Sequence, residues 1–169
     1  MPTLVQLDKA REHLPEGFRS EDILFAWTDS LLALPDKNGN YSPSLQIPEI
    51  ERGKVPILIE ESKVEKVDDR NLITEGKVIE VPELPLESGF IQEWDESLGL
   101  PTKVGENPNE KFEGLFSIDK RYDFHEGLRA IIYGLPPLGE LCKGRFVSAC
   151  LSPSFSHRSL GFYLARVLK

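Results

Sequence analysis

Residues 123–169 read DFHEGLRAIIYGLPPLGELCKGRFVSACLSPSFSHRSLGFYLARVLK, and the fold that we predict depends on this stretch. Asp123 can accept hydrogen bonds from the free amides of a first helical turn, and Glu126 can reach back to the cap amide. Apolar side chains then recur at helical spacing before Pro136, namely Phe124, Leu128, Ile131, Ile132 and Leu135. We therefore predict a helix here and expect Ile131 to lie in the core.

The second half of this stretch predicts a strand followed by another helix. Residues 145–151 are β-branched and apolar enough for a largely buried strand, which Pro153 ends. Ser154 or Ser156 can cap a last helix, whose apolar face consists of Leu160, Tyr163, Leu164, Val167 and Leu168. The stretch thus predicts a C-terminal helix–strand–helix unit.

Two further helices are predicted at the N-terminal end of the chain. Thr3 and Gln6 have the spacing of a capping box, which predicts a short helix over residues 3–14. Acidic residues follow Ser20, and apolar side chains continue at helical intervals to Leu34, which predicts a second helix. We expect Trp27 to lie on the buried face of that helix.

The middle of the chain has the residue pattern of β-strands. Residues 54–82 alternate apolar and polar side chains and predict three or four antiparallel strands, the first of them at an edge because it contains Pro56. Residues 83–109 contain many prolines and glycines and predict a long irregular excursion. Residues 112–118 are expected to return as a strand.

The composition is that of one globular domain over residues 1–169. The chain is 40% hydrophobic and 28% charged, with a mean hydropathy of -0.28. We predict an α+β fold with two N-terminal helices, a central antiparallel sheet and the C-terminal helix–strand–helix unit. No apolar run is long enough to span a bilayer, and two cysteines make no disulfide framework, so we expect a cytoplasmic protein without membrane contact.

The charge of the chain is unevenly distributed. The net charge is -8, but residues 143–169 contain five basic and no acidic residues, which gives +5 there and -13 elsewhere. This basic end either packs against the acidic remainder or forms a local site for an anion. Because the whole chain is acidic, we do not expect it to bind nucleic acid.

A candidate anion site lies between the predicted last strand and the last helix. Ser154, Ser156, His157 and Arg158 could hold a phosphate or carboxylate with the free amides of the helix start, or the serines could only cap that helix. Arg158 and Gly161 match the coenzyme-binding pattern of the GCN5-related N-acetyltransferases, which this segment resembles, although Tyr163 replaces its final small residue. The resemblance implies an enzyme that binds a phosphate-bearing coenzyme at residues 154–158.

A second alternative concerns Glu61 and Lys63, which follow an apolar run. An acid and a lysine two residues apart on one strand resemble the metal-dependent nucleases of the PD-(D/E)xK type, in which the acid binds a metal beside the lysine. Glu49 or Glu51 would have to supply another carboxylate. An exposed cross-strand ion pair is the simpler interpretation of the same triplet.

The remaining candidates favour neither a metal nor a catalytic nucleophile. Cys142 and Cys150 lack the close spacing of zinc ligands, and we expect Cys150 to be a buried apolar residue rather than a nucleophile paired with His157. His125 completes no ligand set. We therefore predict a non-enzymatic binding or assembly protein without cofactor, whose partner is another protein or a second copy of the chain.

Overall fold

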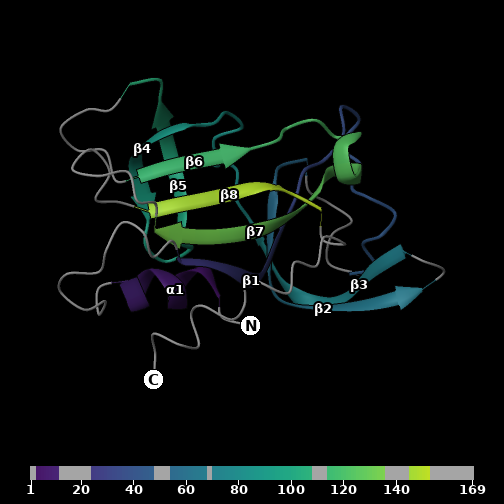
Figure 1. Ribbon diagram of the computed structural model, residues 1–169. Helices are drawn as coiled ribbons and strands as arrows, with labels where there is room; N and C mark the ends of the chain where they lie inside the picture. The colour runs from purple at the N-terminus through teal and green to yellow at the C-terminus, as the bar shows by residue number, and fades with distance from the viewer. Residues whose placement is uncertain are drawn as a thin grey trace.

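The computed structural model describes residues 3–11, 24–47, 54–67, 70–107, 114–135 and 145–152. Within these residues it contains one mixed sheet of eight strands, one α-helix and one short 3-10 helix (Figure 1). The protein is therefore mostly β, and the predicted α+β fold with two N-terminal helices and a C-terminal helix–strand–helix unit is wrong. No helix in the described part of the chain is long and apolar enough to cross a membrane.

The helices and strands follow one another along the chain as α1 (Leu4–Arg11), β1 (Leu24–Ala33), β2 (Ile57–Val67), β3 (Arg70–Glu80), β4 (Gly89–Asp95), β5 (Leu100–Gly105), β6 (Gly114–Ile118), the 3-10 helix (Phe124–Gly127), β7 (Leu128–Leu135) and β8 (Arg145–Leu151). In space the strands are ordered β3-β2-β1-β7-β8-β6-β4-β5. β6 and β8 pair in parallel, and the other neighbours pair antiparallel. The predicted strands over residues 112–118 and 145–151 are confirmed as β6 and β8.

The first predicted helix is confirmed as α1, together with its capping box. The amide of Thr3 donates to Gln6 Oε1 at 3.0 Å, and the amide of Gln6 donates to Thr3 Oγ1 at 3.2 Å. Leu4 and Leu7 are buried against the sheet. The helix thus covers one face of the sheet near the start of the chain.

The predicted helix over residues 20–34 is wrong, because residues 24–33 form strand β1. Leu31 and Ala33 contact one core cluster, whereas Leu32 and Leu34 contact another on the opposite face. A strand buried on both faces has a continuous apolar run instead of an alternating one, and such a run also fits a helix. The side chain of Trp27 lies outside the described residues, so its burial stays a prediction.

The predicted helix after Asp123 is wrong for the same reason. Only Phe124–Gly127 form a single 3-10 turn, and β7 follows directly. Leu128 and Ala130 contact one core cluster, whereas Ile131 and Tyr133 contact the other. The burial of Ile131 is confirmed, but in a strand. The predicted last helix lies outside the described residues.

The predicted irregular excursion over residues 83–109 is also wrong, because it contains the hairpin of β4 and β5. Ile91 of β4 and Leu100 of β5 are buried in the main core. The glycine at the turn has a structural reason: Gly99 has a φ of +68°, and a Cβ there would lie 2.8 Å from Leu4 Cβ. The prolines and glycines of this segment therefore mark the turn of a hairpin.

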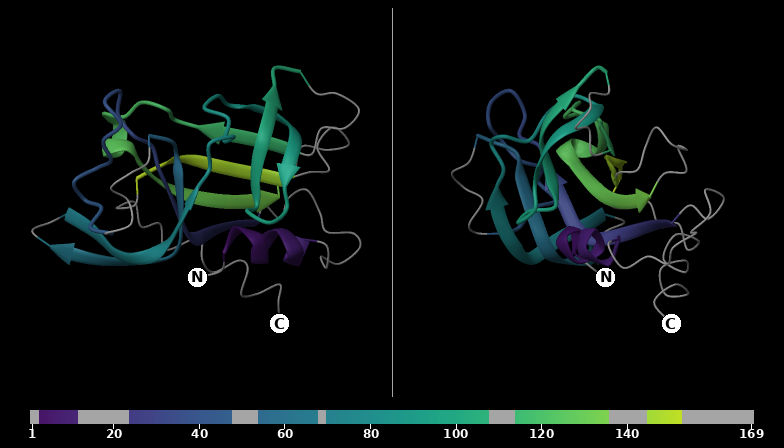
Figure 2. Two further views of the ribbon diagram at one scale, coloured as in Figure 1. Left: turned by 180° about the vertical axis from the view of Figure 1, so that it is seen from behind. Right: turned by 90° about the vertical axis from the view of Figure 1, so that its left-hand side faces the viewer.

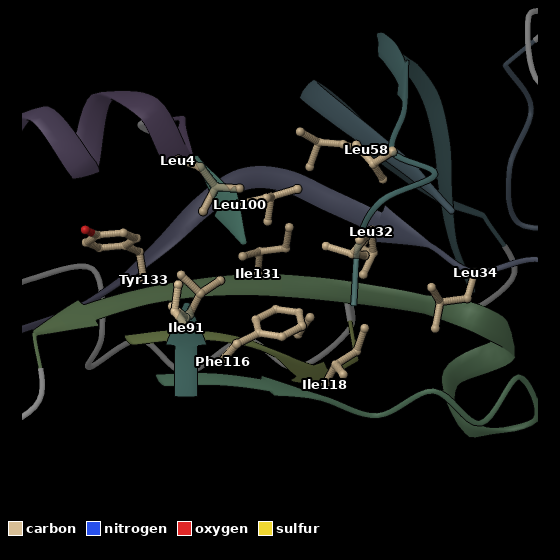
Figure 3. Packing of buried hydrophobic residues seen from close by; sticks show 14 of the residues in the cluster. Leu4, Leu32, Leu34, Leu58, Ile91, Leu100, Phe116, Ile118, Ile131 and Tyr133 are labelled. Carbon is tan, nitrogen blue, oxygen red and sulfur yellow. The ribbon is translucent and has the colours of Figure 1, made fainter. Parts of the chain in front are cut away.

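The main core lies inside the curl of the sheet (Figure 3). Leu58 of β2 and Leu100 of β5 belong to one cluster, although their strands lie near opposite ends of the strand order. Figure 2 shows how this is possible, because β4 and β5 run steeply across β7 and β8. The sheet therefore folds over itself, with Leu4 of α1 packed at the open side next to Leu100.

β2 and β3 replace the three or four strands that were predicted for residues 54–82. β2 lies between β3 and β1, so the predicted edge position of the strand after Pro56 is wrong. β1 pairs with β2 only at residues 57–59. Beyond this point, residues 61–67 and 70–75 form a two-stranded ribbon that extends past the other strands (Figure 1).

Candidate functional site

The residues predicted as an anion site lie outside the part of the chain that the structure describes. Ser154, Ser156, His157 and Arg158 all follow the last described residue, Ser152. Cys142 and the side chain of His125 also lie outside it. Anion binding and the coenzyme site that the acetyltransferase resemblance implies therefore stay predictions.

Glu61 and Lys63 lie at a bulge in β2, where Glu61 and Ser62 together oppose Gly76 of β3. Glu61 has a φ of +52°, so the regular alternation that would place it on the same face as Lys63 is interrupted. Lys63 Nζ instead lies 3.1 Å from Glu75 Oε1 across the ribbon. Glu49 and Glu51 lie outside the described residues.

Metal-binding side chains do not converge in the described part of the chain. It contains no group of three or more His, Cys, Asp or Glu side chains that could hold a metal ion. Cys150 is half-buried, with its Sγ 3.2 Å from Ser117 Oγ of the parallel neighbour β6. The predicted full burial of Cys150 is thus only partly met.

A buried polar cluster joins α1 to the sheet. Asp8 Oδ1 accepts hydrogen bonds from Tyr133 Oη and from Arg145 Nε, both at 2.6 Å. Asp8 Oδ2 accepts a third from Arg145 Nη2 at 3.1 Å, which completes a bidentate pair. The Arg145 guanidinium also lies over the ring of Trp94, 4.4 Å from its centroid. All three hydrogen-bonding side chains are buried, which indicates that this cluster fixes the helix on the sheet.

A second buried cation, Arg129, also has a structural role. Its guanidinium donates to the carbonyl of Asp119 at 2.7 Å, to that of Leu128 at 3.0 Å, and to that of Arg121. Burial lowers the pKa of Arg129. The side chain of Arg121 donates to Asp119 and lowers the pKa of that carboxyl group to about 2. The cation thus holds the chain that leaves β6.

A pocket of about 210 Å³ lies between the β3–β4 connection and the turn of the β4–β5 hairpin. Its floor is apolar and is formed by Val81, Pro82, Leu84, Leu98, Leu100 and Pro101. This floor is fixed in place, because Val81, Leu84 and Leu100 are also part of the main core. The amide of Val81 donates to the carbonyl of Pro56 at 2.9 Å, which ties the connection to the start of β2.

Three acidic residues line the same pocket: Glu80, Glu83 and Asp95. Hydrogen bonds from Ser97 lower the pKa of Asp95, so its carboxyl group stays charged at a lower pH than an ordinary aspartate. Ser97 and Leu98 donate to Asp95 Oδ1, and neither donates to Oδ2. Among the residues that the structure describes, Glu80 and Glu83 have no ion-pair partner.

Comparisons with models of known protein families, with curated proteins and with solved structures gave no match. The function of the chain therefore has to be argued from its own residues. Sequence reasoning missed this pocket, because Glu83 and Asp95 belong to a segment that we predicted to be irregular. The usable signal was Glu83 beside Pro82 and Asp95 four residues before Gly99, since Pro82 and Gly99 mark the two turns that form the pocket.

Proposed function

We propose that this protein is a binding protein whose pocket between the β3–β4 connection and the β4–β5 turn receives a basic side chain of another protein. The observation on which this rests is that six apolar and three acidic residues line one pocket. The proposal makes the predicted class, a non-enzymatic binding protein, specific to one site. The proposal includes the cytoplasmic location that the sequence predicts.

The size of the pocket supports a side chain as the ligand. Pockets for drug-sized ligands and cofactors have volumes of roughly 300–1,000 Å³. A pocket of about 210 Å³ is smaller and suits one long side chain. Lysine and arginine place their apolar stems on apolar surface while the charged group stays near water. Val81, Leu84 and Leu98 are apolar residues in the lining of the pocket.

The charges of the pocket support a cationic organic group over a metal ion. Glu80, Glu83 and Asp95 do not form one of the clusters that could hold a metal. A guanidinium or ammonium group, by contrast, can interact with carboxylates at several positions around it. The net charge of -8 favours basic partners over acidic ones as well.

The test uses capped tripeptides Ala-X-Ala, in which X is arginine, lysine or the uncharged citrulline, with binding followed by amide NMR shifts. We expect the arginine and lysine peptides to shift the amides of residues 81–84 and 95–102, and the citrulline peptide to have little effect. The double variant E80Q/E83Q should bind the arginine peptide several-fold more weakly, because an exposed ion pair contributes about 0.2–1 kcal/mol.

The matched control is Glu96→Gln. Glu96 is exposed and lies in the same turn as Asp95, but it does not line the pocket. Its substitution removes one carboxylate, against two in E80Q/E83Q, and should leave peptide binding unchanged. Equal binding by the parent protein and by E80Q/E83Q, or equal binding of arginine and citrulline peptides, would rule out the pocket as a site for basic side chains.

A further inference from the structure

Within the described residues, the ribbon of residues 61–67 and 70–75 has one open edge. On the β3 side, residues 44–46 run alongside: the Ile73 amide donates to the Ser44 carbonyl at 3.0 Å, and the Gln46 amide donates to the Ile73 carbonyl at 3.1 Å. On the β2 side, β1 pairs only as far as Ile59. Beyond Ser62, no other strand in the described ranges pairs with this edge of β2.

The open edge carries exposed apolar side chains between charges of opposite sign. Val64 and Val67 are each 44% exposed. Lys63 and Glu65, on either side of Val64, are exposed too. Lysines on an edge normally keep other strands away, because like charges would meet. Here the residue before Val64 is basic and the residue after it is acidic. Two antiparallel copies of this edge can therefore place opposite charges next to each other.

We propose that two copies of this chain associate by antiparallel pairing of their β2 edges about a two-fold axis at Val64. In that register, Val64 lies opposite Val64 of the second copy. Lys63 of each chain then lies opposite Glu65 of the other, and directly opposite residues share one face of an antiparallel pair. The two ribbons form a four-stranded sheet, which is more stable than a ribbon of two strands alone.

The second copy is the occupant that these charges favour. A two-fold axis repeats every contact, so one Lys63–Glu65 pair implies a second. A strongly acidic or basic partner would meet a residue of opposite charge on one side of Val64 and a residue of like charge on the other. This interface involves none of the residues that line the pocket, so it is independent of the proposed binding site.

The decisive experiment uses two charge reversals, K63E and E65K, each followed by sedimentation velocity over a range of protein concentrations. In either variant alone, like charges lie opposite each other at both contacts, so we expect a dimer dissociation constant at least about tenfold higher than that of the parent. In an equimolar mixture, residues 63 and 65 are complementary at both contacts. The mixture should therefore form heterodimers, which energy transfer between differently labelled variants detects.

The control is Glu93→Lys, which reverses one charge of the exposed cross-strand pair between Lys103 and Glu93 in the β4–β5 hairpin. It should dimerise as the parent does. Circular dichroism and thermal melting should show that each variant is folded, because the substituted positions are exposed. A parent protein that stays monomeric at millimolar concentration overturns the proposal. A dimer that K63E and E65K leave intact, or a mixture without heterodimers, overturns it as well.

Discussion

The centre of the sheet and the ribbon consist of similar strands, but different interactions stabilise the two regions. β7 lies between two neighbours, and its residues are buried on both faces, in two separate core clusters. The ribbon has one neighbour for each strand over most of its length, with exposed valines and a cross-strand ion pair. Burial of apolar area therefore fixes the centre, whereas the ribbon, apart from the buried Ile73, depends on weaker interactions.

The difference also separates where the protein is stabilised from where it can interact. Centre strands have no free backbone groups to offer a partner, whereas an edge presents unpaired amides and carbonyls. The pocket combines both properties, because its floor belongs to the main core and its carboxylates reach the surface. The substitutions below test this difference from the largest expected effect to the smallest.

The largest effect is expected for Asp8→Ala in the cluster between α1 and the sheet. The substitution leaves Arg145 buried without its bidentate partner and removes the acceptor of Tyr133. Breaking a buried ion pair from one side costs about 3–5 kcal/mol. We expect that decrease in the free energy of unfolding, measured by urea denaturation.

The control for this prediction replaces both partners, as Asp8→Leu with Arg145→Met. A buried pair exchanged for apolar side chains of similar volume is often close to neutral. The double variant should therefore be clearly more stable than Asp8→Ala. If the two have the same midpoint, the loss in Asp8→Ala does not come from an unpaired buried charge.

Ile131→Ala should destabilise the centre of the sheet by about 2–5 kcal/mol. Ile131 is fully buried, and loss of its side chain leaves a cavity where β7 meets the main core. The matched control is Leu86→Ala, since Leu86 is 42% exposed and should change stability far less. Equal urea midpoints for the two variants would contradict the assignment of Ile131 to the core.

The sequence predicted local features well where one interaction decides them. The capping box of Thr3 and Gln6 depends on neighbouring residues only, and it is present as predicted. The burial of Ile131 followed from its apolar character. The secondary structure around Ile131 could not be predicted from spacing, because a strand with two buried faces and a helix both allow a continuous apolar run.

The candidate site could not be predicted, because it depends on contacts between distant parts of the chain. Glu83 and Asp95 line one pocket because the β4–β5 turn lies next to the β3–β4 connection. Asp8 meets Arg145 across almost the whole chain. No spacing rule links such residues, and the prolines and glycines of residues 83–109 suggested irregular structure where they mark turns.

Gly76→Ala tests the junction between the sheet and the ribbon. A Cβ at this position would lie 2.4 Å from Ile59 Cγ2, inside the bulge formed by Glu61 and Ser62. Ile59 is buried and cannot move freely, so the added methyl group should cost about 1–3 kcal/mol. A thermal melt that matches the parent would show that the bulge adapts without strain.

The smallest effect is expected for Lys63→Ala within the ribbon. Its ion pair with Glu75 has a separation of 3.1 Å, but the two side chains are 58% and 66% exposed, so water and salt screen the attraction. Glu75 raises the pKa of Lys63, so the lysine is charged throughout the neutral range. We expect only a small loss of stability at low salt, and a smaller one at 1 M salt. The measurement should be made at a concentration where the protein is monomeric, because Lys63 also lies on the proposed dimer edge. A loss as large as that of Ile131→Ala would mean that the ribbon is as important for stability as the centre of the sheet.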